Sequence, residues 1–111
     1  MPRTVKLLNS NGGWRMLVWF LYDITDNKTR NKVIKMAKGY GLTRVQKSIF
    51  LGNITKNNID EIVLQSENLI NQETDSLYIL PMCKSDYEEV SLIGHGFDKD
   101  VLSGEINTLV I

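Results

Sequence analysis

The sequence of 111 residues is poor in the residue types that typify secreted, membrane or zinc-binding proteins. It has one cysteine, Cys83, which excludes an intrachain disulfide and suits a reducing cytosol. It has one histidine, His95, and without a second His or a Cys pair neither side chain can anchor zinc. No apolar run is long enough to span a membrane, and the N-terminal stretch lacks a signal-peptide core. We therefore expect a soluble, cytoplasmic protein with no membrane partner.

One stretch lacks acidic residues altogether, although the formal net charge of the chain is +0. Residues 60–111 hold eleven of the thirteen acids, whereas residues 27–59 hold none. The cations of that acid-free stretch are Lys28, Arg30, Lys32, Lys35, Lys38, Arg44, Lys47 and Lys56. This segregation predicts a basic pole that could meet nucleic-acid phosphates. A solvated, lysine-rich helix face would produce the same pattern.

The apolar run Met16–Tyr22 is the most informative feature, because it is apolar at every position and ends abruptly at Asp23. A run of this length and bulk predicts a buried strand. A carboxylate at the end of such a strand must reach solvent, a partner charge or a metal. The preceding residues contain the turn-prone "NSNGG", so we expect a flexible extension over 1–14 and a single domain over 15–111.

Two helices are predicted after this strand. The first runs from Asp26 to about Tyr40, with Thr25 as its cap and Gly41 as its left-handed stop. Its apolar stripe comprises Val33, Met36, Ala37 and Tyr40. The second is capped by Thr55, and its apolar period is formed by Ile59, Ile62, Val63, Leu69 and Ile70.

Four further segments have the composition of strands: 42–51 ("LTRVQKSIFL"), 75–82 ("DSLYILPM"), 88–94 ("EEVSLIG") and 106–111 ("INTLVI"). Residues 42–54 contain no turn signal before Gly52. This part of the chain is therefore either one long bent strand or a pair of strands with a very tight break near Lys47.

The order of these elements predicts an α+β sandwich in which both helices cover one face of an antiparallel sheet. Strand 16–22 is apolar on both faces, so the second face needs a cover as well. A second copy of the chain would give a two-fold homodimer with sheet packed on sheet. The C-terminal segment alone could serve instead.

The segment "MLVWFLYDITDNKTRNKVIKMAKGYGLTRVQKSIFLGNIT", followed by a helix and "DSLYILPM", resembles a known family. This is the second family of the CRISPR-associated (Cas) series, the small nuclease-like partner of the integrase in spacer acquisition. The resemblance covers about residues 16–95, in the same order and spacing. It implies a ferredoxin-like protomer, a homodimer with facing sheets, and a metal-dependent phosphodiesterase centre at the interface. The implied role is antiviral CRISPR adaptation.

The resemblance also implies site residues. Asp23 matches the strand-end catalytic aspartate, and Arg30, Arg44, Ser48 and Phe50 lie in motifs that the family associates with nuclease activity. Lys32 departs from the pattern, since some members carry a second arginine there and a lysine lacks the planar fork. We further assign phosphate contacts to the basic-pole residues Arg30, Lys32, Lys35, Lys38, Arg44 and Lys47.

The chemistry of Asp23 supports a metal site on independent grounds. Mg²⁺ or Mn²⁺ prefers hard oxygen ligands, and Asp23 and Asp26 are the only acids in residues 1–59. Asp26 is explained as a first-turn helix acid. One carboxylate makes a poor metal site, whereas a dimer axis near Asp23 would supply two.

Three functions remain open from the sequence. The protein could be a metal-dependent endonuclease on RNA or DNA, a non-catalytic scaffold that joins integrase subunits on DNA, or a toxin-type ribonuclease on the same fold. Phe50 could be a core residue or a platform for a base, whereas Trp19 is expected in the core.

Overall fold

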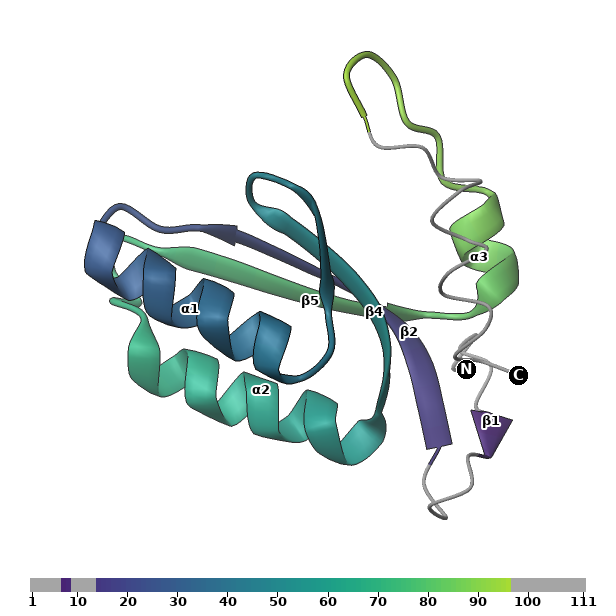
Figure 1. Ribbon diagram of the computed structural model, residues 1–111, viewed down its shortest axis with the longest axis horizontal. Helices are drawn as coiled ribbons and strands as arrows, with labels where there is room; N and C mark the ends of the chain where they lie inside the picture. Colours follow the sequence, from purple (N-terminus) through teal and green to yellow (C-terminus); the bar gives the residue numbers. More distant parts are fainter. Residues whose placement is uncertain (1–6, 9–13, 97–111) are drawn as a thin grey trace.

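The computed structural model describes residues 7–8 and 14–96 and has an antiparallel sheet with two long helices (Figure 1). In chain order the elements are β1 (Leu7–Leu8), β2 (Trp14–Asp23), α1 (Asn27–Gly39), β3 (Thr43–Gln46), β4 (Ile49–Thr55), α2 (Lys56–Leu69), β5 (Ser76–Met82) and α3 (Lys84–Glu88). The main strands lie in the order β5-β2-β4-β3. This is the ferredoxin-like arrangement, so the predicted α+β class is confirmed.

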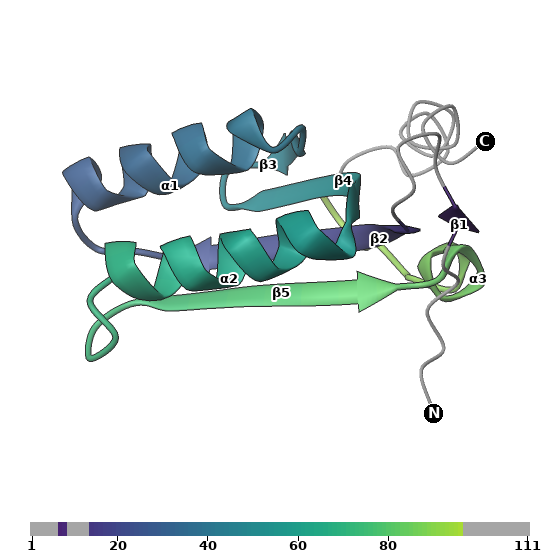
Figure 2. The same ribbon diagram turned by 90° about the horizontal axis from the view of Figure 1, so that it is seen from below.

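Both long helices lie side by side on one face of the sheet, as predicted (Figure 2). Strand β2 supplies the centre of this layer through its even-numbered side chains Met16, Val18, Phe20 and Tyr22. These pack against Val33, Met36 and Ala37 of α1 and against Ile59 and Ile62 of α2. Val63 is an exception to the predicted stripe, because it is 38% exposed while Ser66 takes the inward position.

The odd-numbered residues of β2 face away from the helices, as strand alternation requires. Leu17 and Trp19 form a second apolar cluster with Leu51 and Tyr87 on this far face of the sheet. The expectation that Trp19 belongs to the core is thus confirmed. Since β2 is buried on both faces, it is the central strand of the fold in packing as well as in pairing.

The chain after β5 covers the part of the far face that lies over β2, β4 and the β3–β4 turn. Tyr87 of α3 packs there, joined by Val90 and Leu92 from the irregular segment that follows. The predicted strand 88–94 is therefore wrong: these residues bury alternate apolar side chains without joining a ladder of hydrogen bonds. The predicted strand 106–111 lies outside the described residues.

The helix ends confirm the two predicted helices with one change of cap. Thr55 Oγ1 accepts the backbone N–H of Asn58, as expected of the α2 cap. Helix α1 is capped by Asp26 and not by Thr25, because Asp26 Oδ2 accepts the backbone N–H of Thr29 at 2.8 Å. That hydrogen bond from Thr29 holds the pKa of Asp26 below its ordinary value. Gly41 has φ +89°, which confirms the left-handed stop.

Strands β3 and β4 form a hairpin with a break at Lys47 and Ser48, so the tight break is the correct alternative. No non-glycine residue in the described part of the chain has a positive φ. The favoured primed hairpin turns are therefore absent here, since they need positive φ at one or both central residues. A register shift between Arg44 and Gln46 places an irregularity in β3 beside this turn.

Short strand β1 pairs with the first residues of β2, through Leu7 opposite Arg15 and Leu8 opposite Trp14. The division into an extension over 1–14 and a domain over 15–111 stays a prediction. Within the described ranges, no helix is long and apolar enough to cross a membrane.

Gly52 of β4 lies close to Leu42 in the connection between α1 and β3, and a substitution can test this close packing. A Cβ at Gly52 would lie 2.5 Å from Leu42 Cδ2 and 3.2 Å from Leu42 Cα. We expect Gly52→Ala to lower the free energy of unfolding by about 1–3 kcal/mol, because the crowded atoms include backbone. Chemical denaturation measures this.

Gly39→Ala is the matched control, because a Cβ at this helix position meets nothing within 4 Å. It should be neutral or stabilise by up to about 1 kcal/mol, as alanine favours helix. Equal stability of the two variants would contradict the close approach at Gly52.

Candidate nucleic-acid and metal site

Asp23 is the last residue of β2, and its side chain is exposed. It shares the odd parity of Leu17, Trp19 and Leu21, so strand alternation directs it toward the far face. A cavity of about 350 Å³ lies at this end of the sheet. Its lining residues are Tyr22, Asp23, Ile24, Arg30, Lys47 and Ser48. The cavity thus brings together four of the predicted site residues.

Arg30 reaches this cavity from α1, but most of its donors bind the protein itself. Nε and Nη2 donate to the carbonyl oxygen of Ile24 at 3.3 and 3.1 Å, and Nη2 also donates to that of Thr25 at 3.2 Å. Nη1 donates to Asn27 Oδ1. The guanidinium therefore clamps the loop after Asp23 and lines the same cavity as the Asp23 side chain.

Arg44 has a comparable structural role at the β3–β4 turn. Its Nε and Nη2 donate to the carbonyl oxygen of Lys47 at 3.2 and 2.7 Å. The hydroxyl of Tyr22 donates to the same oxygen at 2.7 Å. The backbone N–H of Tyr22 also donates to the carbonyl oxygen of Ser48 at 3.1 Å. These contacts position the turn that carries Lys47 and Ser48 into the cavity.

The remaining predicted cations are available to a ligand. Lys32, Lys35 and Lys38 are exposed on α1, and no ion pair holds them within the described part of the chain. Lys28 and Lys32, four residues apart, share a helix side with Lys35, so the ammonium groups follow the helix length. Exposed Lys47 adds a positive charge beside Asp23.

Phe50 is fully buried and cannot stack on a base. Its ring lies 6.1 Å from that of Phe20 and 6.2 Å from that of Tyr22, centroid to centroid. The core alternative for Phe50 is therefore correct. It supports the site indirectly, as packing behind Tyr22. Ser48 remains beside Asp23 as a second oxygen donor.

The oxygen donors that one chain places at this cavity are too few to form a complete metal site. Among residues 7–8 and 14–96, no three His, Cys, Asp or Glu side chains come close enough together to hold a metal ion. The carboxylate of Asp23 and the hydroxyl of Ser48 are oxygen donors of the kind that Mg²⁺ or Mn²⁺ accepts. Arg30 and Lys47 oppose a cation but favour a phosphate, so a second carboxylate is needed for metal binding.

Tyr22 and Asp75 contribute to the site and were missed by sequence reasoning. Tyr22 reads as one more apolar residue of the strand, yet its hydroxyl binds the turn at Lys47. A phenol at the end of an apolar run was the available signal, since buried Tyr usually finds a hydrogen-bond partner. Asp75 precedes β5, and its Oδ1 accepts the backbone N–H of Thr25 at 3.2 Å. An acid immediately before a strand gave no hint of that partner.

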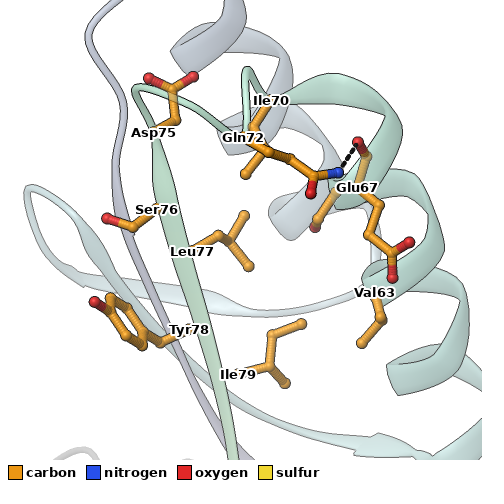
Figure 3. Close-up of a pocket in the computed structure, with 10 residues that line it drawn as sticks. Val63, Glu67, Ile70, Gln72, Asp75, Ser76, Leu77, Tyr78 and Ile79 are labelled. Atoms are coloured by element: carbon orange, nitrogen blue, oxygen red, sulfur yellow. Dashed lines mark hydrogen bonds between the residues drawn. The ribbon is translucent and has the colours of Figure 1, made fainter.

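A second cavity of about 430 Å³ lies between α2 and β5 (Figure 3). Val63, Ile70, Leu77 and Ile79 give it an apolar wall. The Ser66 hydroxyl is buried there and finds no hydrogen-bond partner among the described residues. No predicted site residue lies in this cavity.

Comparison with known proteins agrees with the ferredoxin-like fold. The family described as CRISPR associated protein Cas2 matches residues 16–90. The chain belongs to this family, so the resemblance seen in the sequence is confirmed.

Individual relatives agree. A protein of Korarchaeum cryptofilum, named CRISPR-associated endoribonuclease Cas2, is 39% identical over 87 residues, covering 76% of this chain and 90% of the relative. A relative of the same name from Desulforudis audaxviator is 38% identical over 65 residues, covering 59% of this chain and 61% of the relative. The crystal structure of Streptococcus pyogenes Cas2 gives a TM-score of 0.61 at 27% identity, covering 71% of this chain and all of that one.

A longer relative combines two proteins. It is named CRISPR-associated endonuclease Cas1/endonuclease Cas2 fusion, comes from Thermoproteus tenax, and is 42% identical over 45 residues. The match covers 40% of this chain and 17% of the relative.

Proposed function

We propose that this chain is a nucleic-acid-binding subunit of CRISPR adaptation that acts as a homodimer and cleaves RNA or DNA phosphodiesters with Mg²⁺ or Mn²⁺ held by Asp23. One observation carries the proposal: strand alternation directs Asp23 to the face of the sheet that still exposes apolar side chains. The endoribonuclease names of the relatives support the same reaction class.

The open part of the far face supports dimerisation near Asp23. Tyr78 is 57% exposed and Leu80 is 46% exposed, and they stand opposite Leu21 and Trp19 in the β2–β5 pairing. The rest of the face is covered by Tyr87 and by the segment after it, which reaches the β3–β4 turn, where Gln46 Nε2 donates to the carbonyl oxygen of His95 at 2.7 Å. A two-fold axis through the open β5 side would bring two copies of Asp23 toward each other, because Asp23 pairs with Ser76 at the start of β5.

The paired carboxylates supply the ligands that one chain lacks. Two Asp23 side chains would hold the divalent cation, and the Ser48 hydroxyl lies beside them. When bound, the cation supplies charge neutralisation at the phosphate and lowers the pKa of a coordinated water. Lys47 draws the scissile phosphate into the cavity, and Arg30 keeps the strand end in place.

The lysines of α1 account for binding along the nucleic acid. Lys32, Lys35 and Lys38 offer point charges to successive phosphates, which need no particular base sequence. Binding of this kind suits a protein that handles nucleic acids of many sequences.

A scaffold role is the second candidate, favoured by the incomplete metal site of the single chain and by the Cas1/Cas2 fusion. In that case the basic dimer joins integrase subunits on DNA and needs no chemistry of its own. A toxin-type ribonuclease on the same fold would need neither an integrase nor a repeat array. An adjacent repeat array and integrase gene would exclude that third reading.

The first prediction concerns assembly. Light scattering at micromolar concentration should give about twice the 12.7 kDa chain mass. Leu80→Glu should give the monomer mass, because it places a charge in the proposed interface. Leu64→Glu is the matched control: Leu64 is 62% exposed on α2, so this variant should remain dimeric. A monomeric wild type would remove the shared metal site.

The second prediction concerns salt. The logarithm of duplex DNA affinity should fall linearly with the logarithm of salt concentration, and replacing Lys32, Lys35 and Lys38 by Gln should reduce the slope by up to about 3. Fluorescence anisotropy over a salt series measures it. Lys56→Gln is the control, because Lys56 pairs with Asp60 on α2 and should leave the slope unchanged. An unchanged slope in the triple variant would place the phosphate contacts elsewhere.

The third prediction separates enzyme from scaffold. Asp23→Asn keeps the shape of the side chain and loses its charge, so cleavage of RNA or DNA should fall about a hundredfold or more. The dimer should persist, since the substitution relieves repulsion between facing carboxylates. The assay compares Mg²⁺, Mn²⁺ and EDTA, with spacer acquisition by the cognate integrase measured in parallel.

Asp26→Asn is the matched control for Asp23→Asn. Asp26 is an exposed acid three residues away, and asparagine caps a helix as well as aspartate does. Its cleavage rate should equal that of wild type. Cleavage that persists in Asp23→Asn or in EDTA would overturn the catalytic assignment, whereas lost cleavage with intact acquisition would make the scaffold role the biological one.

A further inference from the structure

We propose that Asp75 is a positioning residue for the Asp23 site, an inference that rests on the proposed function of Asp23. Asp75 lies between α2 and β5, beside the backbone partner of Asp23 in the sheet, Ser76. Figure 3 shows it where β5 begins, with its carboxylate pointing away from the apolar side chains of the cavity. Asp75 thus lines this cavity where β5 begins, and the same position places it at the Asp23 end of the sheet.

The Asp75 carboxylate joins two loops that are far apart in the sequence. Oδ1 accepts the backbone N–H of Thr25 at 3.2 Å, and Oδ2 accepts the backbone N–H of Asn71 at 3.1 Å. The hydroxyl of Thr74 also donates to Oδ1 at 3.2 Å. Since Thr25 follows Asp23 by two residues, the carboxylate holds the chain just beyond the proposed metal ligand.

The loop that carries Asp75 is itself firmly held. The backbone N–H groups of Thr74 and Asp75 donate to the carbonyl oxygen of Asn71 at 3.1 and 2.8 Å. The side-chain oxygen of Asn71 accepts the backbone N–H of Glu73 at 3.0 Å. This turn gives Asp75 a fixed base from which to hold Thr25.

Arg30 completes the restraint from the other side of the same loop. It binds the carbonyl oxygens of Ile24 and Thr25, while Asp75 binds the N–H of Thr25. The sheet pairing of Asp23 with Ser76 fixes the chain on the N-terminal side. Because the chain is held on both sides of Asp23, the backbone of Asp23 has little freedom. The backbone in turn fixes the direction in which the Asp23 carboxylate points.

The two acceptor oxygens explain why this position suits a carboxylate. Both face backbone N–H donors, and an ionised carboxylate accepts at both oxygens. Asparagine has one acceptor oxygen and would turn its amide N–H₂ toward the other donor. Asp75→Asn should therefore keep one of the two backbone contacts and Asp75→Ala neither, which gives a graded pair of variants.

The first readout does not depend on activity. In the metal-free protein, hydrogen exchange of the Thr25 amide should speed up about tenfold or more in Asp75→Ala, because its acceptor is gone. Mn²⁺ binding without nucleic acid, followed by electron paramagnetic resonance, should weaken by about tenfold as the two Asp23 carboxylates lose their common direction. Asp75→Asn should shift both quantities less.

The second readout is kinetic. With Mn²⁺ saturating, Asp75→Ala should lower kcat by a factor between about ten and a hundred, the scale of misplacing a reacting group by about 1 Å. KM for nucleic acid should stay unchanged, since the α1 lysines are untouched.

Two control variants distinguish a positioning role of Asp75 from an effect of lost charge and from an effect of lost stability. Glu73→Gln removes an exposed acid from the same turn and should match wild type in exchange, Mn²⁺ affinity and kcat. Gly52→Ala destabilises the fold at a distance from Asp23 and should leave kcat unchanged at temperatures where it is folded.

The outcomes are distinct. If wild type cleaves and the Asp75 variants have the same kcat, the positioning role is wrong. It is also wrong if the Asp75 variants and Gly52→Ala lose kcat to the same extent. If wild type binds Mn²⁺ but cleaves nothing, the nuclease proposal fails and the Mn²⁺ affinities decide the role of Asp75. A wild type that neither binds Mn²⁺ nor cleaves overturns both.

Discussion

Burial of β2 on both faces is the constraint on which the rest of the molecule depends. Its even-numbered side chains need the two helices, and its odd-numbered side chains need a second cover. The fold supplies that cover over β4 and the β3–β4 turn through Tyr87 and the residues after it, and leaves Tyr78 and Leu80 of β5 exposed. Because Asp23 ends the same strand and shares the parity of its odd-numbered side chains, the proposed dimer and the proposed metal site would both depend on the alternation of side chains along β2.

The arginines and lysines of the basic stretch divide the work between them. Arg30 and Arg44 direct their planar guanidinium groups at backbone carbonyl oxygens, where several donors in fixed geometry can act together. Lys32, Lys35, Lys38 and Lys47 remain exposed. Substitution of either arginine would therefore disturb the shape of the site as well as its charge, whereas the α1 lysines can be changed for their charge alone.

The regular elements were predictable because each has a local cause. The period of Val33, Met36 and Ala37 predicts α1, and the apolar run before Asp23 predicts β2. The cap of α1 was misplaced by one residue because Thr25 and Asp26 are both good caps in adjacent positions. Val90 and Leu92 alternate as in a strand, yet alternation reports one-sided burial and carries no information about a hydrogen-bonded partner.

Four residues of the candidate site, Asp23, Arg30, Lys47 and Ser48, were named from the sequence, whereas Tyr22, Asp75 and the contacts were not. Asp23 could be identified because a carboxylate ending an apolar strand requires an explanation. The roles of Arg30, Arg44 and Asp75 depend on which carbonyl oxygens and N–H groups the folded chain brings within reach, and those partners are set by tertiary structure. Phe50 illustrates the same limit, since only the packing of Phe20 and Tyr22 around it decides between core and surface.

The carbonyl oxygen of Lys47 has a consequence for how this family can vary. It receives hydrogen bonds from Tyr22 and Arg44, so the reversal of the chain between β3 and β4 is specified by side chains outside the turn. Residues at the turn itself are then released from the usual demand for glycine or asparagine. The backbone shape of the turn therefore allows many residue types at the positions of Lys47 and Ser48 in homologous chains. If only a few residue types occur there, the restriction would come from ligand binding and not from the fold.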